Sequence, residues 1–375
     1  MTHIILTIFC ALVIFYIGRK SCRGNLKNKY PPPIPMTSQR NQTEIQMTEM
    51  TKNDSPRKIV KDPTKVLIVA RWHSGSTFAG DLFNKNPKAF YIFEPLCTEK
   101  FPHGISYNQT IANSDTIVPE YQQILTDYYN HCRIPIYSLS KFVALNDKIK
   151  KSGIIPLNVM ASGKIPDSKM DKLTEFCESH EIRVTKTIRL KSLEHLPENL
   201  SKDLKIIYLV RDPRAIVKSR ITRNDIWDLN KGSRPSNTKK RFDRLDHVCE
   251  TYDVFLNQRK NYKFAENILV VRYEDLTYER VKMAEKIYQF IGEKERSNFD
   301  EKLAHRFEHN ARASIRISKG WRGVLDFSVV DRVQKGCDKV FEAFGYEKVL
   351  DDQEYEKLRN ESSWVLNPGC VDCDW

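Results

Sequence analysis

Short apolar runs, each bounded by charged or polar residues, recur along the chain after residue 65. Five of them have the length of a buried strand, at residues 66–70, 90–93, 183–188, 205–210 and 268–271. Longer stretches have apolar positions three or four residues apart, notably 240–264, 277–291 and 328–344. The short runs are typical of strands and the longer period is typical of helices. Strands that alternate with helices predict an α/β fold, a parallel sheet flanked by helices.

The first predicted strand leads into a loop of small residues and then into a helix. Residues 71–77 read RWHSGST, and the helical pattern that follows ends before Pro87. The backbone N–H groups and hydroxyls of residues 74–77, together with the helix N-terminus, form a site for a phosphate-like anion. The loop lacks the lysine and the first glycine of the Walker pattern, which disfavours an ATP or GTP enzyme that chelates magnesium. Helix capping by Ser76 or Thr77 is the structural alternative.

A second segment, residues 205–220, carries positive charge to the end of another strand. Arg211 lies at the strand's exit, Pro213 opens a helix at its first position, and Ser219 lies two turns into that helix. Arg211 and Ser219 can therefore approach one anion from different sides. We interpret Asp212 as a helix cap.

Four ordered segments of the chain resemble one family. They are RWHSGSTFAGDLF with FEPL, LVRDPRAIVKSR, VVRYEDL, and WRGVL with VQKGCDKVFEAFGY, spanning about residues 66 to 346. The chain resembles the Golgi carbohydrate sulfotransferases that sulfate the 6-hydroxyl of galactose, N-acetylglucosamine or N-acetylgalactosamine. The resemblance implies the P-loop-like sheet of the sulfotransferase fold, as a single domain over residues 65–350. It also implies 3′-phosphoadenosine 5′-phosphosulfate (PAPS) as sulfate donor, with no metal.

The resemblance also implies the donor-binding residues. The loop at 71–77 resembles the 5′-phosphosulfate-binding segment, and Arg211 with Ser219 resembles the pair that holds the 3′-phosphate. Trp321 and Arg322 suit closure over adenine or the phosphates, with core packing of Trp321 as the alternative. The predicted donor site therefore comprises Arg71, Trp72, His73, Ser74, Gly75, Ser76, Thr77, Arg211, Ser219, Trp321 and Arg322.

The chain departs from the family pattern at two places. His73 stands where family members usually have arginine, and a neighbouring phosphate would favour its protonated form, so we expect donor affinity to depend on pH. Cys97 and Thr98 follow EPL in place of the family's usual continuation, which bears on acceptor choice. We expect that choice to lie in the loops at 97–165 and 222–240.

Glu94 is the predicted catalytic base, because it ends the second strand close to the anion loop and a sugar hydroxyl must lose a proton during transfer. His73, His103 and His131 are rival bases. We expect structural roles for Asp275, as a helix cap, and for Arg272.

The N-terminus predicts a membrane anchor. Residues 1–18 contain the uncharged run IILTIFCALVIFYI and precede a basic cluster. We expect a signal-anchor at 1–18, a flexible luminal stem at 19–64 and a C-terminal tail at 351–375, in a single-pass type II protein of the Golgi membrane. The positive-inside rule favours the opposite orientation. Five N-x-S/T sequons favour a luminal body, at Asn41, Asn53, Asn108, Asn199 and Asn360.

The net charge and the cysteines limit which ligands and metals the sequence predicts. The net charge of +13 is compatible with an anionic ligand, yet no basic stripe interleaved with aromatic residues indicates nucleic acid. Apart from Cys10 and Cys22, in and beside the anchor, seven cysteines remain in the body, an odd number, so at least one is expected to be unpaired. Cys370 and Cys373 form a lone C-x-x-C pattern, which disfavours zinc. A glycan or proteoglycan acceptor is expected, and a homodimer is left open.

Two other functions remain open from the sequence. A Golgi glycosyltransferase would share the anchor and stem but generally needs a D-x-D triplet, which occurs here at residues 372–374, in the tail. A non-catalytic glycan-binding protein on the sulfotransferase fold is suggested by His73. Retention of residues 74–76, Arg211 and Ser219 favours the active enzyme.

Overall fold

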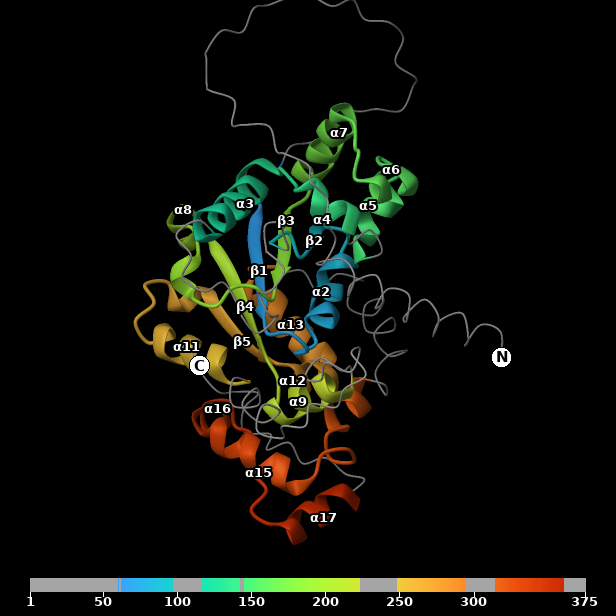
Figure 1. Cartoon of the computed structure of the whole chain (residues 1–375). Coiled ribbons are helices and arrows are strands. Elements are labelled where there is room, and N and C mark those ends of the chain that lie inside the picture. Colours follow the sequence, from blue (N-terminus) through green and yellow to red (C-terminus); the bar gives the residue numbers. More distant parts are fainter. Residues whose placement is uncertain are drawn as a thin grey trace, which may run out of the picture.

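The structure is a computed structural model and describes residues 60, 62–96, 117–141, 145–222, 248–293 and 314–360. A five-stranded parallel sheet with strand order β2-β3-β1-β4-β5 runs through the centre of this part (Figure 1). Its strands are β1 (Thr64–Ala70), β2 (Ala89–Phe93), β3 (Ile182–Thr187), β4 (Leu204–Val210) and β5 (Ile268–Arg272). The sequence placed all five strands to within two residues at either end. The predicted α/β fold with a parallel sheet is confirmed.

Alternating residues of the strands face two separate apolar layers. Leu67 and Val69 of β1 pack into the larger layer, whereas Val66 and Ile68 pack into the smaller one. Such alternation follows from the two-residue period of a strand. Because every described strand is covered on both faces, helices must supply the material of both layers.

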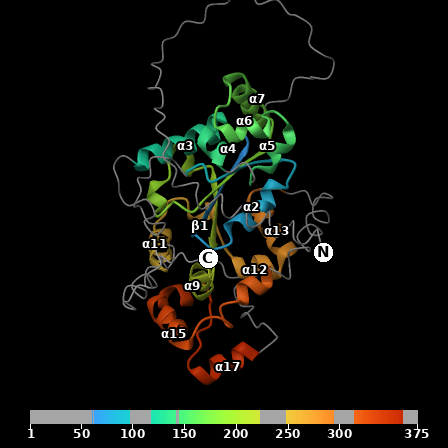
Figure 2. The same cartoon turned by 45° about the vertical axis from the view of Figure 1, so that its right-hand side comes forward.

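Helices α2 (Ser76–Asn84), α12 (Tyr273–Tyr278) and α13 (Arg280–Phe290) contribute to the smaller layer. The larger layer takes residues from α3 (Ile117–His131), α4 (Ile136–Lys141), α5 (Asp147–Ser152), α6 (Leu157–Ser162), α7 (Asp167–Glu178), α8 (Glu198–Ser201), α9 (Pro213–Thr222), α11 (Glu250–Arg259), α15 (Phe327–Gly336), α16 (Asp338–Ala343) and α17 (Asp352–Asn360). Two short 3-10 helices, Leu193–His195 and Ala265–Asn267, precede β4 and β5. Two views 45° apart place α3 and α11 on one side of the sheet and α2 and α13 on the other (Figures 1 and 2).

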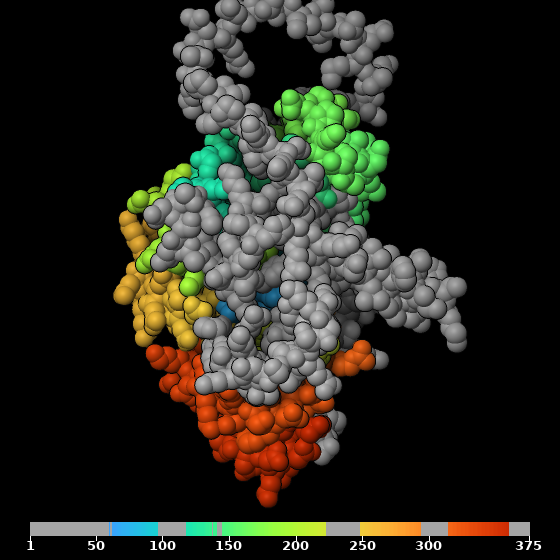
Figure 3. Space-filling view, in the orientation of Figure 1, coloured from blue at the N-terminus to red at the C-terminus, as the bar shows by residue number. Residues whose placement is uncertain are grey.

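The carboxyl ends of the strands meet at the lower edge of the sheet in Figure 1, next to α9, α12 and α15. Among the described residues, the C-terminal segment from α15 to α17 lies at the lower end and α5 to α7 lie at the upper end (Figures 1 and 3). In an open parallel sheet ligands bind outside the carboxyl edge, so the site is expected between the sheet and the C-terminal segment.

Two disulfides join the larger layer. Cys132 at the end of α3 bonds Cys177 of α7, and Cys249 before α11 bonds Cys337 between α15 and α16. No pairing was predicted from the sequence, and Cys97, Cys370 and Cys373 lie outside the described residues.

Two helix expectations need correction. The pattern at 328–344 is divided at Cys337 into α15 and α16, and the pattern at 277–291 is divided at Glu279, whose backbone leaves the helical region. The predicted anchor and stem up to residue 59 lie outside the described residues. Within the described residues, no helix has the length and apolar character that a membrane crossing requires.

Candidate active site

The loop after β1 makes a tight turn with a left-handed backbone at His73 and Gly75, and the Ser74 N–H donates to the carbonyl of Arg71 at 3.0 Å. Gly75 adopts φ 88°, and a Cβ at this position would lie 2.2 Å from the ring of Tyr273, so only glycine fits here. The buried Ser74 hydroxyl donates to the carbonyl of Arg71 at 2.5 Å and tightens the turn. Helix α2 begins at Ser76, so its first N–H groups face the loop, where an anion would be stabilised. Thr77 is exposed and Ser76 is buried.

Glu94 lies at the exit of β2 in an ion pair that the sequence did not predict. Its Oε1 accepts from Lys186 Nζ at 2.6 Å, and both side chains are less than 5% exposed. Lys186 Nζ also donates to the Ser76 hydroxyl at 3.1 Å and lies 4.0 Å above the ring of Phe93. Lys186 therefore joins the predicted base to the first residue of α2. Glu94 itself has φ 51°, a strained conformation for a residue with a side chain.

The second carboxylate oxygen of Glu94 is different. Oε2 is buried and has no hydrogen-bond partner among the described residues. Buried polar atoms are nearly always hydrogen bonded, so an exception at the carboxyl edge of a parallel sheet indicates a position that a ligand completes.

Arg211, Ser219 and His73 come together at the exits of β1 and β4. Arg211 donates from Nη1 to the carbonyl of His73 at 2.7 Å and from Nη2 to the carbonyl of Ile317 at 3.1 Å. The Ser219 hydroxyl lies 3.3 Å from His73 Nδ1. The ring of His73, which has φ 68°, also contacts that of Trp72, with centroids 4.3 Å apart. The two residues predicted to hold the 3′-phosphate thus lie beside the loop.

Two predicted donor residues occupy other surroundings than expected. Arg71 is 5% exposed, and its guanidinium bonds the hydroxyl of Thr251, with burial lowering its pKa. Because that side chain is held against α11, any donor contact by Arg71 would fall to its main chain. Trp321 is 1% exposed; it stacks on Tyr355 and lies 4.1 Å from the guanidinium of Arg214. Trp321 is therefore packed in the core, which was the alternative to a contact with adenine or the phosphates.

Arg322 is half-buried next to Trp321, with its guanidinium 5.6 Å from the ring centroid. The rival base His131 is exposed and lines a surface hollow with Glu178, near the amino end of the sheet, so it lies away from the site. His103 lies outside the described residues. No group of three or more His, Cys, Asp or Glu side chains that could hold a metal occurs within the described ranges.

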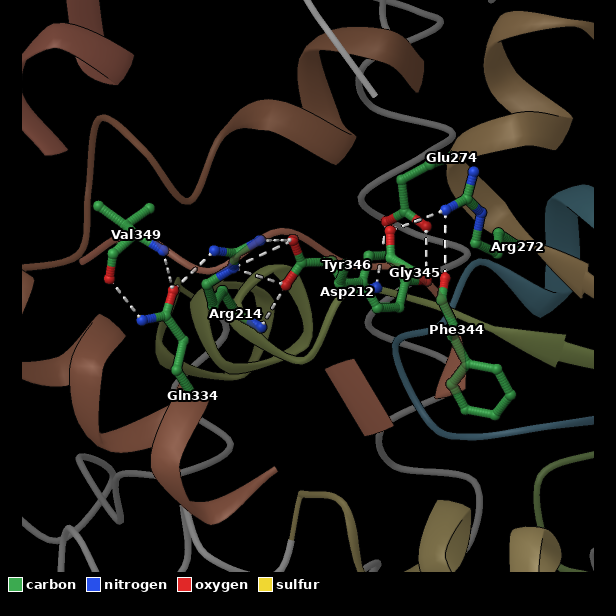
Figure 4. A network of polar contacts seen from close by, with 9 residues as sticks. All are labelled: Asp212, Arg214, Arg272, Glu274, Gln334, Phe344, Gly345, Tyr346 and Val349. Atoms are coloured by element: carbon green, nitrogen blue, oxygen red, sulfur yellow. Dashed lines mark hydrogen bonds and ion pairs between the residues drawn. The ribbon is translucent and has the colours of Figure 1, made fainter. Parts of the chain in front are cut away.

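A network of buried charges surrounds the exits of β4 and β5 (Figure 4). Asp212 caps α9 by accepting from the Arg214 N–H at 2.8 Å and pairs with the Arg214 guanidinium, as the capping interpretation expected. Arg272 pairs with Asp275 at 2.7 Å, so both residues have structural roles. The expectation that Asp275 caps a helix is wrong, because Asp275 lies within α12 and its carboxylate accepts from the Arg272 guanidinium. Arg214 and Arg272 then reach the C-terminal segment through Gln334 and the carbonyls of residues 344 and 345.

Glu274 is the fully buried carboxyl at the centre of this network. It accepts from the Asp212 N–H at 3.2 Å and from the Tyr346 hydroxyl at 3.0 Å. Burial, reinforced by the neighbouring Asp212, raises the pKa of Glu274 to about 7.

Comparisons with known proteins identify the family of the chain. Residues 63–345 match the family described as "Sulfotransferase domain". Carbohydrate sulfotransferase 1 of Danio rerio is 26% identical over an alignment that covers 79% of this chain and 80% of the relative. Carbohydrate sulfotransferase 4 of Mus musculus is 25% identical, with 81% and 87% covered. A solved retinol dehydratase complex with retinol and PAP aligns with TM-score 0.41 and 16% identity, covering 79% of this chain and 85% of that one.

The chain therefore belongs to the sulfotransferase family and is an enzyme of that family. The resemblance to carbohydrate sulfotransferases that the four ordered segments indicated is confirmed. The glycosyltransferase alternative has no support from these matches.

Sequence reasoning missed Lys186. In the segment RVTKT, Lys186 has the pattern of an ordinary polar residue on one face of a strand. A signal was nevertheless present, because a lysine within a strand that is buried on both faces needs a partner, and its place at the strand's carboxyl end indicates the site.

Proposed function

We propose that the protein transfers a sulfuryl group from PAPS to the 6-hydroxyl of a galactose or hexosamine residue in a glycan or proteoglycan chain. The observation that carries this proposal is the buried carboxylate of Glu94, which pairs with Lys186 next to the anion loop and has one oxygen without a hydrogen-bond partner among the residues that the structure describes. A base beside an anion cradle is what transfer of an anionic group to a hydroxyl requires.

The proposed division of labour follows from these contacts. The loop and the N-terminus of α2 bind the 5′-phosphosulfate, and Arg211 with Ser219 binds the 3′-phosphate. Glu94 Oε2 accepts the proton of the sugar hydroxyl while that oxygen forms its bond to sulfur. The bond between sulfur and the 5′-phosphate oxygen breaks, and Lys186 and the loop stabilise the negative charge that develops there.

The class of acceptor is supported by the relatives, whose names identify them as carbohydrate sulfotransferases. N-acetylglucosamine or galactose is the preferred acceptor, followed by the N-acetylgalactosamine of chondroitin. We also propose a Golgi-membrane protein with a luminal catalytic domain. Two disulfides and the exposed sequon residue Asn199 support this compartment.

The test is transfer of radiolabelled sulfate from PAPS by the full-length protein to a panel of glycans, beside its Glu94→Gln and Arg211→Ala forms. Transfer to one acceptor that is lost in Glu94→Gln would support both activity and base. Failure with every acceptor, with no protection of the protein against heat by PAPS, would contradict the proposal and favour the glycan-binding alternative.

A further inference from the structure

The strand exit that carries Arg211 is fixed by side chains from two other elements. The Arg211 N–H is bonded to the Tyr252 hydroxyl of α11 at 3.2 Å. The next N–H, that of Asp212, is bonded to Glu274 Oε1 of α12 at 3.2 Å. Residues 211 and 212 lie just beyond β4, where ladder hydrogen bonds have ended, so these two side chains set the direction in which the main chain leaves the sheet.

That direction determines where the Arg211 guanidinium lies. The guanidinium donates to the carbonyls of His73 and Ile317 and lies 4.6 Å from the ring of Tyr273. Arg211 Nη1 is therefore directed at the loop, and Arg211 Nη2 at the segment that precedes α15. A guanidinium recognises phosphate through a planar fork of donors, which tolerates little displacement.

Glu274 is poorly explained as a stabilising residue. It is fully buried, and its raised pKa shows that the site disfavours its charge. Replacing a buried charged group by a packed apolar one is often neutral or stabilising, whereas a carboxylate with two fixed acceptors can orient what it binds. Orientation is therefore the role that its contacts support.

The orientation of Glu274 depends on the C-terminal segment. Its Oε2 accepts from the Tyr346 hydroxyl at 3.0 Å. The main chain just before Tyr346 is fixed in turn, because Arg272 Nη1 donates to the carbonyls of Phe344 and Gly345 at 3.1 and 3.3 Å (Figure 4). A continuous chain of contacts thus runs from β5 through Tyr346 and Glu274 to the exit of β4.

We propose that Glu274 and Tyr346 are positioning residues for the donor: through the Asp212 N–H they hold Arg211 in the orientation that binds the 3′-phosphate. Neither residue touches the donor. The inference rests on the proposed function, since it presumes that Arg211 contacts a nucleotide phosphate. It makes the C-terminal segment part of the donor site by way of α12.

The experiment compares Glu274→Leu, Glu274→Gln and Tyr346→Phe in the full-length protein, with titration by adenosine 3′,5′-bisphosphate (PAP), the desulfated donor. Glu274→Leu removes both acceptors and should raise the Kd for PAP about 10-fold, the effect of weakening one charged hydrogen bond. Glu274→Gln keeps an acceptor for the Asp212 N–H and should restore the Kd to within about 3-fold of the wild type. Tyr346→Phe should fall between these two.

The matched control is Tyr128→Phe. The Tyr128 hydroxyl is also buried and donates to the carbonyls of Phe90 and Val184 at 2.9 and 3.0 Å, on β2 and β3, which β1 separates from β4. It should lower the unfolding temperature as Tyr346→Phe does, without changing the Kd for PAP. For the Glu274 and Tyr346 variants, the KM for PAPS should rise while kcat stays near the wild-type value.

The outcomes separate the inference from the proposed function. Wild-type protein that fails to bind PAP would overturn the donor assignment itself. Wild-type binding with an unchanged Kd in Tyr346→Phe and in folded Glu274→Leu would overturn the positioning role alone. A Kd in Glu274→Gln as weak as in Glu274→Leu would likewise contradict it, because the acceptor would then not be the feature that matters.

Discussion

The two halves of the carboxyl edge both bury carboxylates, and they differ in how completely the carboxylate oxygens are hydrogen bonded. At the exits of β4 and β5, Asp212, Asp275 and Glu274 have hydrogen-bond donors on both carboxylate oxygens. At the exit of β2, Glu94 has Lys186 on one oxygen and, within the part of the chain that the structure describes, no partner for the other.

This difference separates the structural from the chemical use of the same residue type. The saturated carboxylates hold the C-terminal segment against the sheet, Glu274 directly through Tyr346 and the two aspartates through their partners Arg214 and Arg272. The incomplete carboxylate keeps one strong acceptor in a buried place, which costs free energy unless a ligand completes it. Variants on each side of the edge can test whether this distinction holds.

The largest expected effect is on Glu94. Glu94→Gln should lower the single-turnover rate of sulfate transfer by about 10²- to 10⁴-fold, because the amide cannot accept the proton, while PAP affinity stays within a few-fold. Glu279→Gln, an exposed carboxylate of the same type beside α12, is the control and should leave the rate unchanged. Equal loss in PAP affinity and rate would indicate that Glu94 serves binding instead.

The next effect concerns the partner of Glu94. Lys186→Met leaves a buried carboxylate uncompensated and should lower the free energy of unfolding by about 3 to 5 kcal/mol in urea denaturation. Adding Glu94→Gln should recover part of that loss. Lys335→Met breaks the exposed pair with Asp331 and should cost less than about 1 kcal/mol. Additive losses in the double variant would mean that the two side chains are not coupled.

In the half with the saturated carboxylates, Glu274 should make the free energy of unfolding depend on pH. The pKa of Glu274 is about 7 in the folded protein, above its ordinary value of 4.5, so the folded state binds this proton more tightly than the unfolded state. Its contribution to stability is complete below pH 4.5 and is lost as pH rises through 7. Glu274→Gln lacks the titration, so its unfolding free energy should gain about 3 kcal/mol on the wild type between pH 4.5 and 8. A constant difference across this range would contradict the shift.

The smallest effect concerns donor binding at the boundary between the halves. Arg211→Ala should weaken PAP binding by about 10- to 150-fold, equivalent to roughly 1.5 to 3 kcal/mol of charged hydrogen bonds. Lys205→Ala removes a cation from the opposite end of β4, where it bonds Asn267, and should leave the Kd unchanged. Calorimetric titration measures the Kd for PAP of both variants. Similar increases in Kd would mean that Arg211 acts only through the overall charge of the protein and not through a direct phosphate contact.

The sequence contained most of the fold because its strands are short, apolar and buried on both faces. The anion loop was also visible, since Ser74, Gly75 and Ser76 follow a strand directly. Glu94 could be placed near that loop because parallel strands end at a common edge.

The pairings across the sheet could not be read. Lys186 lies 92 residues from Glu94, and only the order β2-β3-β1 brings the exits together. Arg71 and Trp321 have residue types that suit a nucleotide, yet their burial depends on α11 and α17, which pack there from distant parts of the chain. The helical pattern at 328–344 is divided at Cys337, where the backbone leaves the helical region and a disulfide is formed. The spacing of apolar residues indicates neither feature.

The two disulfides make the folded state conditional on redox chemistry. They close separations of 45 and 88 residues, which chain-entropy arguments value at about 4 and 5 kcal/mol. A domain typically has only about 5 to 15 kcal/mol of net stability, so thiol reduction would remove a large share of it. The folded state therefore depends on the oxidation of four cysteines. A chain that remains in a reducing environment would have a small free energy of unfolding and would be prone to unfolding and proteolysis, even with every active-site residue intact.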